Sequence, residues 1–390
     1  MRPFNPITRR AVLAGALAVA ASPSAAQTDG FRVIRARDGG YDGKAPGPVL
    51  RVRRGDEVKV RLINELAFAT SIHWHGVRLQ NAMDGTSLTQ ALVAPGASFD
   101  YRFVPPDAGT FWFHPPVRAA QDRALYGLLI VDESQPVDAD RDVALVLDRV
   151  DSKFSVNGLD KLDIPVVANE RIRLRLINAA ARFVTLRIDG QPMHVVAIDG
   201  QPAEPFLSRE SRITLSPGNR ADVFIDAVMK PGSIAPIVVQ NDGADAPLAR
   251  LVYADAAPAR ALPRAEVKPL PANALPEQMD FKGALRIDLD PNAGDIGVPP
   301  KPLFSAKRGR TVQLAIRNRA EHPCVLHIHG HHVRLLDALD DGWKPFWLDT
   351  ILCVPQTTTR VAFVADNPGK WLLNARRLGE GQSLAWFEVS

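Results

Sequence analysis

The chain has 390 residues, of which 46% are hydrophobic and 23% are charged. This is the composition of a globular protein, and it excludes a disordered or fibrous chain. Two cysteines are too few for a disulfide scaffold or for a cysteine-based zinc or iron–sulfur protein. The formal net charge is only +4, and it falls further if the arginine-containing N-terminal segment described next is removed. We therefore expect no nucleic-acid partner.

Residues 1–26 have the features of an export signal. Thr8-Arg9-Arg10 precedes an apolar run that ends at Ala21, and Ser24-Ala25-Ala26 supplies small residues for cleavage. The paired arginines predict a twin-arginine-type signal peptide, with a general secretory signal as the alternative. Either route predicts a periplasmic protein. The apolar run is shorter than the roughly 20 residues that span a bilayer, so we expect no membrane span after cleavage.

Three stretches of the chain resemble one another. Residues 60–64, 174–178 and 314–318 each alternate apolar and polar side chains, as a half-buried strand does, and each ends in Asn. A glycine follows twelve residues after each Asn, and a proline marks a later turn in each copy: these are Gly76, Gly190 and Gly330, then Pro95, Pro217 and Pro355. Shared spacing at three landmarks indicates an internal repeat.

The repeat, the short strand patterns and the many Pro and Gly turns predict three consecutive all-β domains of the Greek-key sandwich or barrel type. We place domain 1 at residues 27–135, domain 2 at 140–255 and domain 3 at 280–390. Residues 256–279 are rich in Pro and Ala and are expected to form an extended, semi-rigid linker.

Histidines recur at one position of the repeat. Residues two apart on a strand face the same side, so His73 and His75 project together, as do His327 and His329. His114, at the end of a predicted strand, can add a fifth imidazole. Neutral imidazole suits copper, zinc or nickel, and copper binds it most tightly. A lone His-x-His is usually no metal site, but recurrence in two domains favours one.

The other histidines carry weaker expectations. At the position where domains 1 and 3 carry their His-x-His pairs, domain 2 has Arg and Asp. We therefore expect domain 2, including its His194, to have a structural role. His322 falls in a predicted loop and is also expected to be structural. For His331 and His332, a place at or next to the metal and exposure to solvent both remain open.

These motifs together resemble those of multicopper oxidases over nearly the whole chain after residue 26. The motifs of domain 1 are Pro46-Gly47-Pro48, Gly55-Asp56, residues 70–76, Asp84-Gly85, Thr89-Gln90 and residues 109–114; those of domain 2 are Asn157-Gly158, residues 173–178 and residues 217–222; those of domain 3 are residues 326–331 and Asp349-Thr350. The resemblance implies three cupredoxin-like Greek-key β-sandwich domains. It also implies a trinuclear copper cluster between domains 1 and 3, and a blue type 1 copper in domain 3 that takes electrons from substrate.

The resemblance also implies roles for single residues. His73 and His327 match the two type 2 copper ligands. His75, His114 and His329 match type 3 ligands. Asp84 matches the acidic residue that delivers protons to oxygen reduction in the family.

The chain departs from the family pattern at the remaining ligand positions. Pro116 stands in place of a ligand histidine, and Asn374-Ala375-Arg376 replaces the family's His-Cys-His. Cys324 replaces a type 1 imidazole, and the chain has no His after His332 and no Cys after Cys353. A blue copper site needs one Cys and two His, so none is expected here. The charge of Arg376 would also oppose a second copper ion.

We therefore predict one copper ion at a site reduced to type 2 and type 3 remnants between domains 1 and 3. The protein would act in copper handling or limited redox chemistry. The first alternative is a copper-free periplasmic scaffold that binds a protein partner, as the SufI-type cell-division relatives of this family do. The second is a functional multicopper oxidase, which the missing Cys–His relay disfavours. Whether Cys324 and Cys353 form a disulfide in an oxidising compartment is left open.

Overall fold

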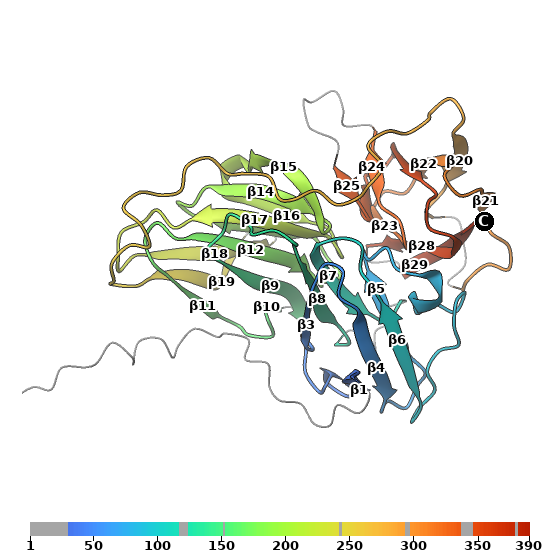
Figure 1. Ribbon diagram of the computed structural model, residues 1–390, viewed down its shortest axis with the longest axis horizontal. Helices are drawn as coiled ribbons and strands as arrows, with labels where there is room; N and C mark the ends of the chain where they lie inside the picture. Colours follow the sequence, from blue (N-terminus) through green and yellow to red (C-terminus); the bar gives the residue numbers. More distant parts are fainter. Residues whose placement is uncertain are drawn as a thin grey trace, which may run out of the picture.

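The computed structural model describes residues 30–116, 124–150, 153–241, 244–292, 297–336, 346–378 and 381–390. The export signal predicted for residues 1–26 lies outside the described residues. Within the described residues, strands dominate and the helical elements are the short 3-10 turns η1 (Asn81–Met83) and η3 (Arg209–Ser211) (Figure 1). The predicted all-β fold of three cupredoxin-like sandwiches is confirmed.

Domain 1 is a sandwich of two four-stranded sheets. One sheet has the order β2-β1-β4-β6 and the other β3-β8-β7-β5. The strands are β1 (Arg32–Arg37), β2 (Gly40–Tyr41), β3 (Val49–Arg53), β4 (Val58–Asn64), β5 (His73–His75), β6 (Ser98–Phe103), β7 (Gly109–His114) and β8 (Gly127–Asp132). In β4 buried residues alternate with partly exposed ones, so this strand turns one face to the core, as its sequence predicts.

Domain 2 pairs a six-stranded sheet, β10-β9-β12-β17-β14-β15, with a five-stranded sheet, β11-β19-β18-β13-β16. The strands are β9 (Arg141–Val150), β10 (Lys153–Val156), β11 (Leu162–Val166), β12 (Arg171–Asn178), β13 (Val184–Ile188), β14 (Met193–Ile198), β15 (Gln201–Leu207), β16 (Arg212–Leu215), β17 (Arg220–Asp226), β18 (Ile234–Asn241) and β19 (Ala244–Tyr253).

Domain 3 has two five-stranded sheets, β20-β22-β27-β24-β25 and β21-β29-β28-β23-β26. The strands are β20 (Leu285–Leu289), β21 (Phe304–Ala306), β22 (Thr311–Asn318), β23 (Cys324–Ile328), β24 (Val333–Leu335), β25 (Trp347–Leu348), β26 (Thr350–Cys353), β27 (Thr357–Val364), β28 (Gly369–Arg377) and β29 (Gly381–Val389). Each domain encloses its own cluster of buried apolar side chains.

The repeated Asn explains why the three copies share their spacing. Its side-chain amide donates to the carbonyl four residues later and to the carbonyl two residues before the repeated proline, and its Oδ1 accepts the amide N–H two residues later. This pattern holds for Asn64, Asn178 and Asn318. Each Asn therefore joins the end of one strand to a turn that is distant in sequence, which fixes both landmarks.

Strand β12 differs from the predicted half-buried pattern, because every one of its residues is buried. Its charged positions are arginines that lie against domain 1, against acidic side chains and, for Arg171, against residue 265 of the linker. Arg173 pairs with Glu133 and Asp222, and Arg175 donates to Thr110 of β7. Charged side chains that are paired across a domain interface lose solvent without being left unsatisfied.

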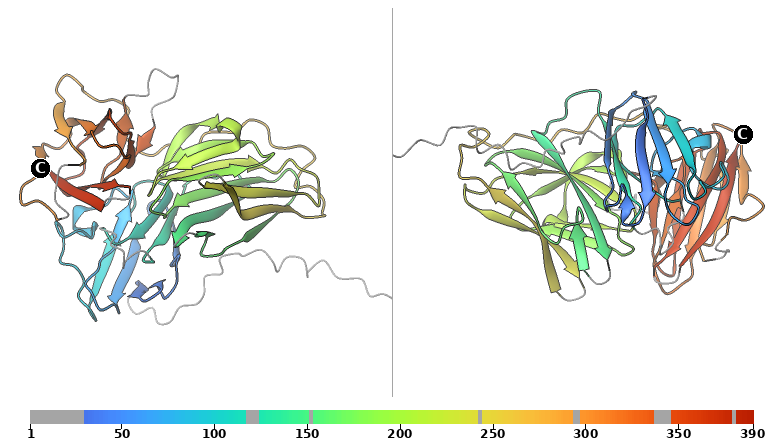
Figure 2. Two further views of the ribbon diagram at one scale, coloured as in Figure 1. Left: turned by 180° about the vertical axis from the view of Figure 1, so that it is seen from behind. Right: turned by 90° about the horizontal axis from the view of Figure 1, so that it is seen from below.

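Each domain contacts the other two (Figures 1 and 2). Residues 256–279 form no helix or strand, and this yellow-to-orange segment crosses domain 2 on its way to domain 3 (Figure 1). Asn273 of this segment exchanges hydrogen bonds with Ala108 of domain 1 and donates to Gln201 of domain 2. No helix in the described part of the chain is long and apolar enough to cross a membrane.

Candidate metal centre

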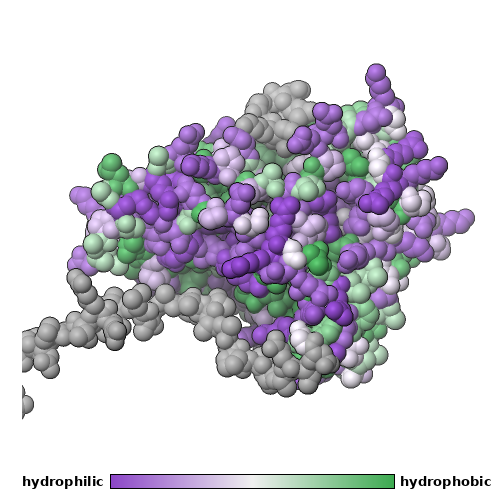
Figure 3. All heavy atoms as spheres, viewed as in Figure 1, coloured by the Kyte–Doolittle hydropathy of each residue, from purple (hydrophilic) through white to green (hydrophobic). Residues whose placement is uncertain are grey.

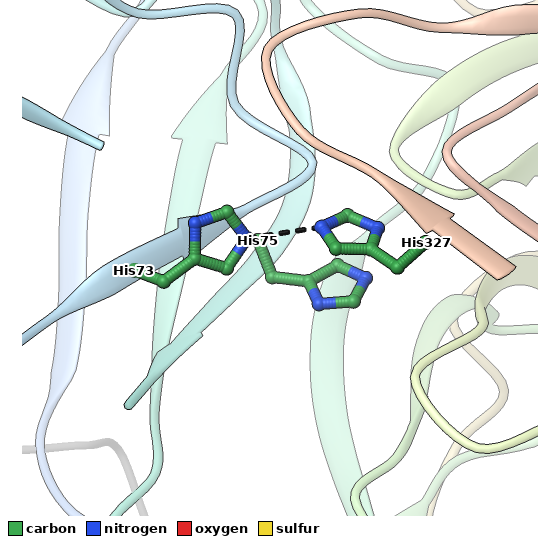
Figure 4. A group of neighbouring side chains, drawn as sticks. All are labelled: His73, His75 and His327. Carbon is green, nitrogen blue, oxygen red and sulfur yellow. Dashed lines mark hydrogen bonds between the residues drawn. The ribbon is translucent and has the colours of Figure 1, made fainter. Parts of the chain in front are cut away.

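Strands of domains 1 and 3 bring five imidazoles together. β5 lies antiparallel to β7, with His73 opposite His114 and His75 opposite Trp112. His327 lies on β23 of domain 3, and His329 follows the end of that strand. All five histidines are buried. Figure 4 shows the rings of His73 and His75 beside that of His327, which enters from the other domain.

The first pair of imidazoles joins the two domains directly. Nε2 of His73 lies 2.9 Å from Nε2 of His327 (Figure 4). The other nitrogen of His73, Nδ1, lies 3.0 Å from a carboxylate oxygen of Asp84, and Nδ1 of His327 lies 2.9 Å from the carbonyl oxygen of Asp349. Both partners are acceptors only, so each Nδ1 carries the proton and donates. The two Nε2 atoms therefore face each other as lone pairs.

The second pair repeats this arrangement within domain 1. Nδ1 of His75 lies 3.0 Å from Nε2 of His114. His75 donates from Nε2 to Oδ1 of Asp349 at 3.1 Å, and His114 donates from Nδ1 to the carbonyl of Pro115 at 2.6 Å. The two nitrogens that face each other, Nδ1 of His75 and Nε2 of His114, therefore again both present lone pairs.

His329 completes the set. Its Nδ1 donates to Asp84 at 3.0 Å, and its Nε2 is buried without a hydrogen-bond partner among the described residues. The rings also stack across the domain boundary, His329 on His73 at 3.7 Å and His327 on His75 at 3.6 Å. Five lone pairs are therefore held inside one buried cluster.

Two carboxylates fix these tautomers. Asp84 of domain 1 accepts from His73 and His329, one imidazole from each domain. Asp349 of domain 3 accepts from His75 through its side chain and from His327 through its backbone. Each of these aspartates, through its carboxylate or its backbone carbonyl, therefore orients one ring of domain 1 and one of domain 3, as outer partners of metal-bound imidazoles do.

Domain 2 supports the cluster through Asp349. Arg220 of β17 donates to both oxygens of Asp349, at 2.8 and 2.5 Å. Asp199 accepts the backbone N–H groups of Arg220, Asp349 and Thr350. All three charged side chains are fully buried, so the pairing offsets a large desolvation cost. The predicted structural role of domain 2 includes this contact.

Burial sets the protonation of the cluster. It lowers the pKa of His75, His327 and His329, to about 3 for His329. These rings are therefore neutral near pH 7 and keep their lone pairs. Burial alone would raise the pKa of Asp84, but the His329 and His73 rings beside it outweigh that effect and keep the pKa below its usual value.

The geometry fits a bound metal ion. Two nitrogens bound at about 2.1 Å and at right angles to each other lie about 3.0 Å apart, which matches the 2.9 and 3.0 Å of the facing pairs. His73, His75 and His327 each place a donor atom within 4.8 Å of the others, as do His73, Asp84 and His329. The residues of the cluster therefore fit an imidazole-preferring ion such as copper.

The substituted ligand positions lie beside the same cluster. On β28, Asn374, Ala375 and Arg376 pair with His327, Leu326 and Val325 of β23. Asn374, Arg376 and Pro116 line one cavity together with His75 and His114. Cys324 lies opposite Cys353 on neighbouring strands, and the structure shows both as free, buried thiols.

Two further histidines lie near the cluster. His331 and His332 are buried, so of the two alternatives left open for them, exposure to solvent is excluded. His332 lies 3.5 Å from Asp349, which places it next to the cluster. His331 packs among Phe363, Trp371 and Phe387. Sequence reasoning gave Asp349 and Arg220 no role beyond their motifs. Their motifs mark the two positions, but no local pattern shows that the two charges meet.

Three multicopper oxidase family models match the chain, over residues 33–136, 127–250 and 271–377. The multicopper oxidase MmcO of Mycobacterium tuberculosis is 28% identical, over 86% of this chain and 79% of that protein. The solved structure of Lac15 from a marine microbial metagenome is 31% identical, with a TM-score of 0.80 over 92% of this chain and 99% of that one.

A solved multicopper oxidase from Pseudomonas thermotolerans is 30% identical to this chain, with a TM-score of 0.79. The alignment covers 90% of this chain and 93% of that structure. Identity at this level over nearly both whole chains, together with three matching domain models, goes beyond a shared fold. The chain belongs to the multicopper oxidase family.

Proposed function

We propose that this chain is an exported copper-binding member of the family that holds one copper ion in the histidine cluster between domains 1 and 3. It lacks the type 1 site and acts in copper handling or limited redox chemistry. His73 and His327 hold the ion, and His75, His114 and His329 complete its surroundings. Bound copper would supply one-electron redox chemistry, while the protein orients the rings and shields them from water.

The observation that carries this proposal is that two pairs of imidazole nitrogens face each other with their lone pairs. Nε2 of His73 faces Nε2 of His327, and Nδ1 of His75 faces Nε2 of His114. Each pair needs a cation between its nitrogens, either a proton or a metal ion. Burial lowers the pKa of His75 and His327, so protonation is costly there. The one proposed copper ion, held between His73 and His327, satisfies the nitrogens of that pair without protonating either ring.

The residues around β28 support the loss of the type 1 site. The position that the family gives to the copper-binding cysteine is Ala375, and its neighbours are Asn374 and Arg376. Cys324 stands where a type 1 imidazole is expected, and burial raises its pKa to about 12, which disfavours the thiolate that copper needs. With no sulfur ligand beside two imidazoles, fast electron entry by the family's usual route is not expected.

Copper analysis of the purified mature chain tests the proposal. After reconstitution and removal of excess metal we expect about one copper per chain and no intense blue thiolate band, because no cysteine is placed to bind the ion. A chain that carries both His73→Ala and His327→Ala should lose the metal. His194→Ala, which removes an imidazole of domain 2, should keep it. Less than about 0.2 copper per chain in the unsubstituted protein would contradict the proposal.

The Arg pair at Arg9 and Arg10 supports export by the twin-arginine route, to the periplasm. This part of the proposal is tested by replacing both arginines with lysine and following the mature protein in periplasmic fractions. We expect the periplasmic protein to be lost. Unchanged export would exclude the twin-arginine route.

A further inference from the structure

Three charged side chains lie buried where domains 2 and 3 meet. On the face of the molecule shown in Figure 3, hydrophilic side chains dominate the exterior, as they do in most globular proteins. Asp199, Arg220 and Asp349 depart from this distribution, because each of the three side chains is fully buried. Apolar residues in their place would often stabilise a fold equally well, so these buried charges indicate a role beyond stability.

Asp199 lies in the turn between β14 and β15, and this turn is held between the other two domains. On the side of domain 1, Gly200 packs so closely that a Cβ there would lie 2.7 Å from the ring of Phe111. On the side of domain 3, the carboxylate of Asp199 accepts the backbone N–H groups of Asp349 and Thr350. The turn therefore fixes the backbone of domain 3 at the start of β26.

One peptide group connects this turn to a metal-binding ring. Its N–H, which belongs to Thr350, donates to Oδ2 of Asp199 at 3.1 Å. Its C=O, which belongs to Asp349, accepts Nδ1–H of His327 at 2.9 Å. A peptide group is planar and rigid, so Asp199 holds the acceptor that orients His327. Hydrogen bonds that follow one another in such a chain also strengthen one another.

A second connection runs through the side chain of Asp349. Its carboxylate accepts from both terminal nitrogens of Arg220, at 2.8 and 2.5 Å, and from Nε2 of His75 at 3.1 Å. Burial and the charge of Asp349 raise the pKa of Asp199 to about 6, so Asp199 is ionised at pH 7. Two carboxylates and one guanidinium give the group a net negative charge, which favours a cation in the neighbouring cluster.

We propose that domain 2, which supplies no ligand, sets the copper affinity of the site between domains 1 and 3, with Asp199 and Arg220 as positioning residues that act through Asp349. The inference rests on the proposed function, because it concerns the affinity of the same site. Coupling of this kind is reciprocal. Bound copper therefore strengthens the docking of domain 2 by as much as the docking strengthens the binding of copper.

Asp199→Asn tests the coupling in the full mature chain, with copper affinity measured by competition with a chromophoric chelator. Oδ1 of Asp199 accepts the N–H of Arg220 in domain 2, and Oδ2 accepts N–H groups of domain 3. An amide has one acceptor oxygen, so one of the two domains must lose its hydrogen bond. We expect the affinity to fall about 10-fold, as it does when an outer partner of a metal ligand is lost.

Three further variants distinguish positioning from stability. Arg220→Lys keeps the charge without the paired donors, so it should lower the affinity less than Arg220→Met does. Asp142→Asn is the matched control, because it breaks an ion pair between domains 1 and 2 through Arg51 and does not involve Asp349. It should leave the affinity within about twofold of the unsubstituted protein. A purely structural role would instead make copper affinity follow the melting temperature in every variant, Asp142→Asn included, and would overturn the inference.

Asn219→Ala provides a milder change if Asp199→Asn does not fold. The side-chain amide of Asn219 donates to both oxygens of Asp199 and to the backbone carbonyl of Thr350, so it belongs to the same connection between domains 2 and 3. This variant should also lower the copper affinity, by less than Asp199→Asn. An unchanged affinity in Asn219→Ala and in Arg220→Met would overturn the inference.

A measurement without copper separates this inference from the proposed function. In the metal-free chain, the NMR signal of Nδ1–H of His327, identified by its loss in His327→Ala, should shift in Asp199→Asn and stay in place in Asp142→Asn. An unshifted signal together with an unchanged copper affinity would overturn the inference and leave the proposed function standing. A shifted signal in a chain that takes up no copper would support the positioning by Asp199 and overturn the proposed function.

Discussion

Replacing Asp84 with Asn should weaken copper binding while leaving all five histidines in place. The carboxylate of Asp84 accepts Nδ1–H from His73 at 3.0 Å and from His329 at 3.0 Å. An amide offers one acceptor and one donor, so only one ring can keep its tautomer. The other ring must accept from the amide through Nδ1 and move its proton to Nε2. That Nε2 can then no longer bind a metal ion, which leaves four of the five converging lone pairs.

Loss of such an outer partner lowers metal affinity about 10- to 100-fold, which is about 1.4 to 2.7 kcal/mol of binding free energy. Competition with a chromophoric copper chelator measures this change directly. Asp366→Asn is the matched control, because that carboxylate lies 4.0 Å from His331 and touches no ring of the cluster. An affinity for Asp84→Asn within about twofold of the unsubstituted protein would refute the reasoning about tautomers.

Three further predictions concern the surrounding structure. Gly76 has a φ of +83°, and a Cβ there would clash with Arg220 and Asp349. Gly76→Ala should therefore lower the melting temperature and the copper affinity more than Gly96→Ala, because Gly96 has a similar φ but open space around it. Equal losses in the two variants would argue against the clash. Burial works to raise the pKa of Asp142, but Arg51 and Arg175 outweigh it and lower the pKa to about 2. Because this lies below the unfolded value of about 3.9, the stabilisation is complete above pH 4 and is lost as the pH falls towards 2. In denaturant titrations, Asp142→Asn should therefore lower the free energy of unfolding by about 2 kcal/mol at pH 7 and by little at pH 2. An equal loss at both pH values would contradict the pairing. Cys324 and Cys353 should resist a thiol reagent in the folded protein, because they are buried and burial raises both pKa values. Both should react once the protein is unfolded without reductant. Cysteines that stay unreactive in the unfolded protein would reveal a disulfide.

The fold followed from the sequence because the three copies repeat a structural device. Asn64, Asn178 and Asn318 make the same side-chain hydrogen bonds, so the spacing that suggested a repeat reflects a real constraint on each domain. The expected half-exposure failed at β12, because domain 1 covers the face that carries the arginines while the apolar face packs in the core of domain 2. A pattern within one segment cannot show what another domain will cover. The exact domain boundaries stay predictions.

The histidines of the cluster could be predicted, but not what holds them. His-x-His spacing on a strand places two rings on one face, and the structure brings both pairs and His114 together. The pairing of Asp349 with Arg220 connects domain 3 to domain 2, and no local pattern gives that contact. Burial of His331 and His332 was equally hidden, because it depends on Phe363, Trp371 and the adjoining domains. The role of Asp84 as a proton donor also stays a prediction.

Crystallography of the copper-loaded chain, with diffraction collected at the copper absorption edge, tests the central claim most directly. We expect one strong anomalous peak between domains 1 and 3, about 2 Å from Nε2 of His73 and from Nε2 of His327. No peak should lie near Ala375 and Cys324. A copper ion bound away from these two nitrogens, or a fully occupied blue copper site in domain 3, would contradict the account.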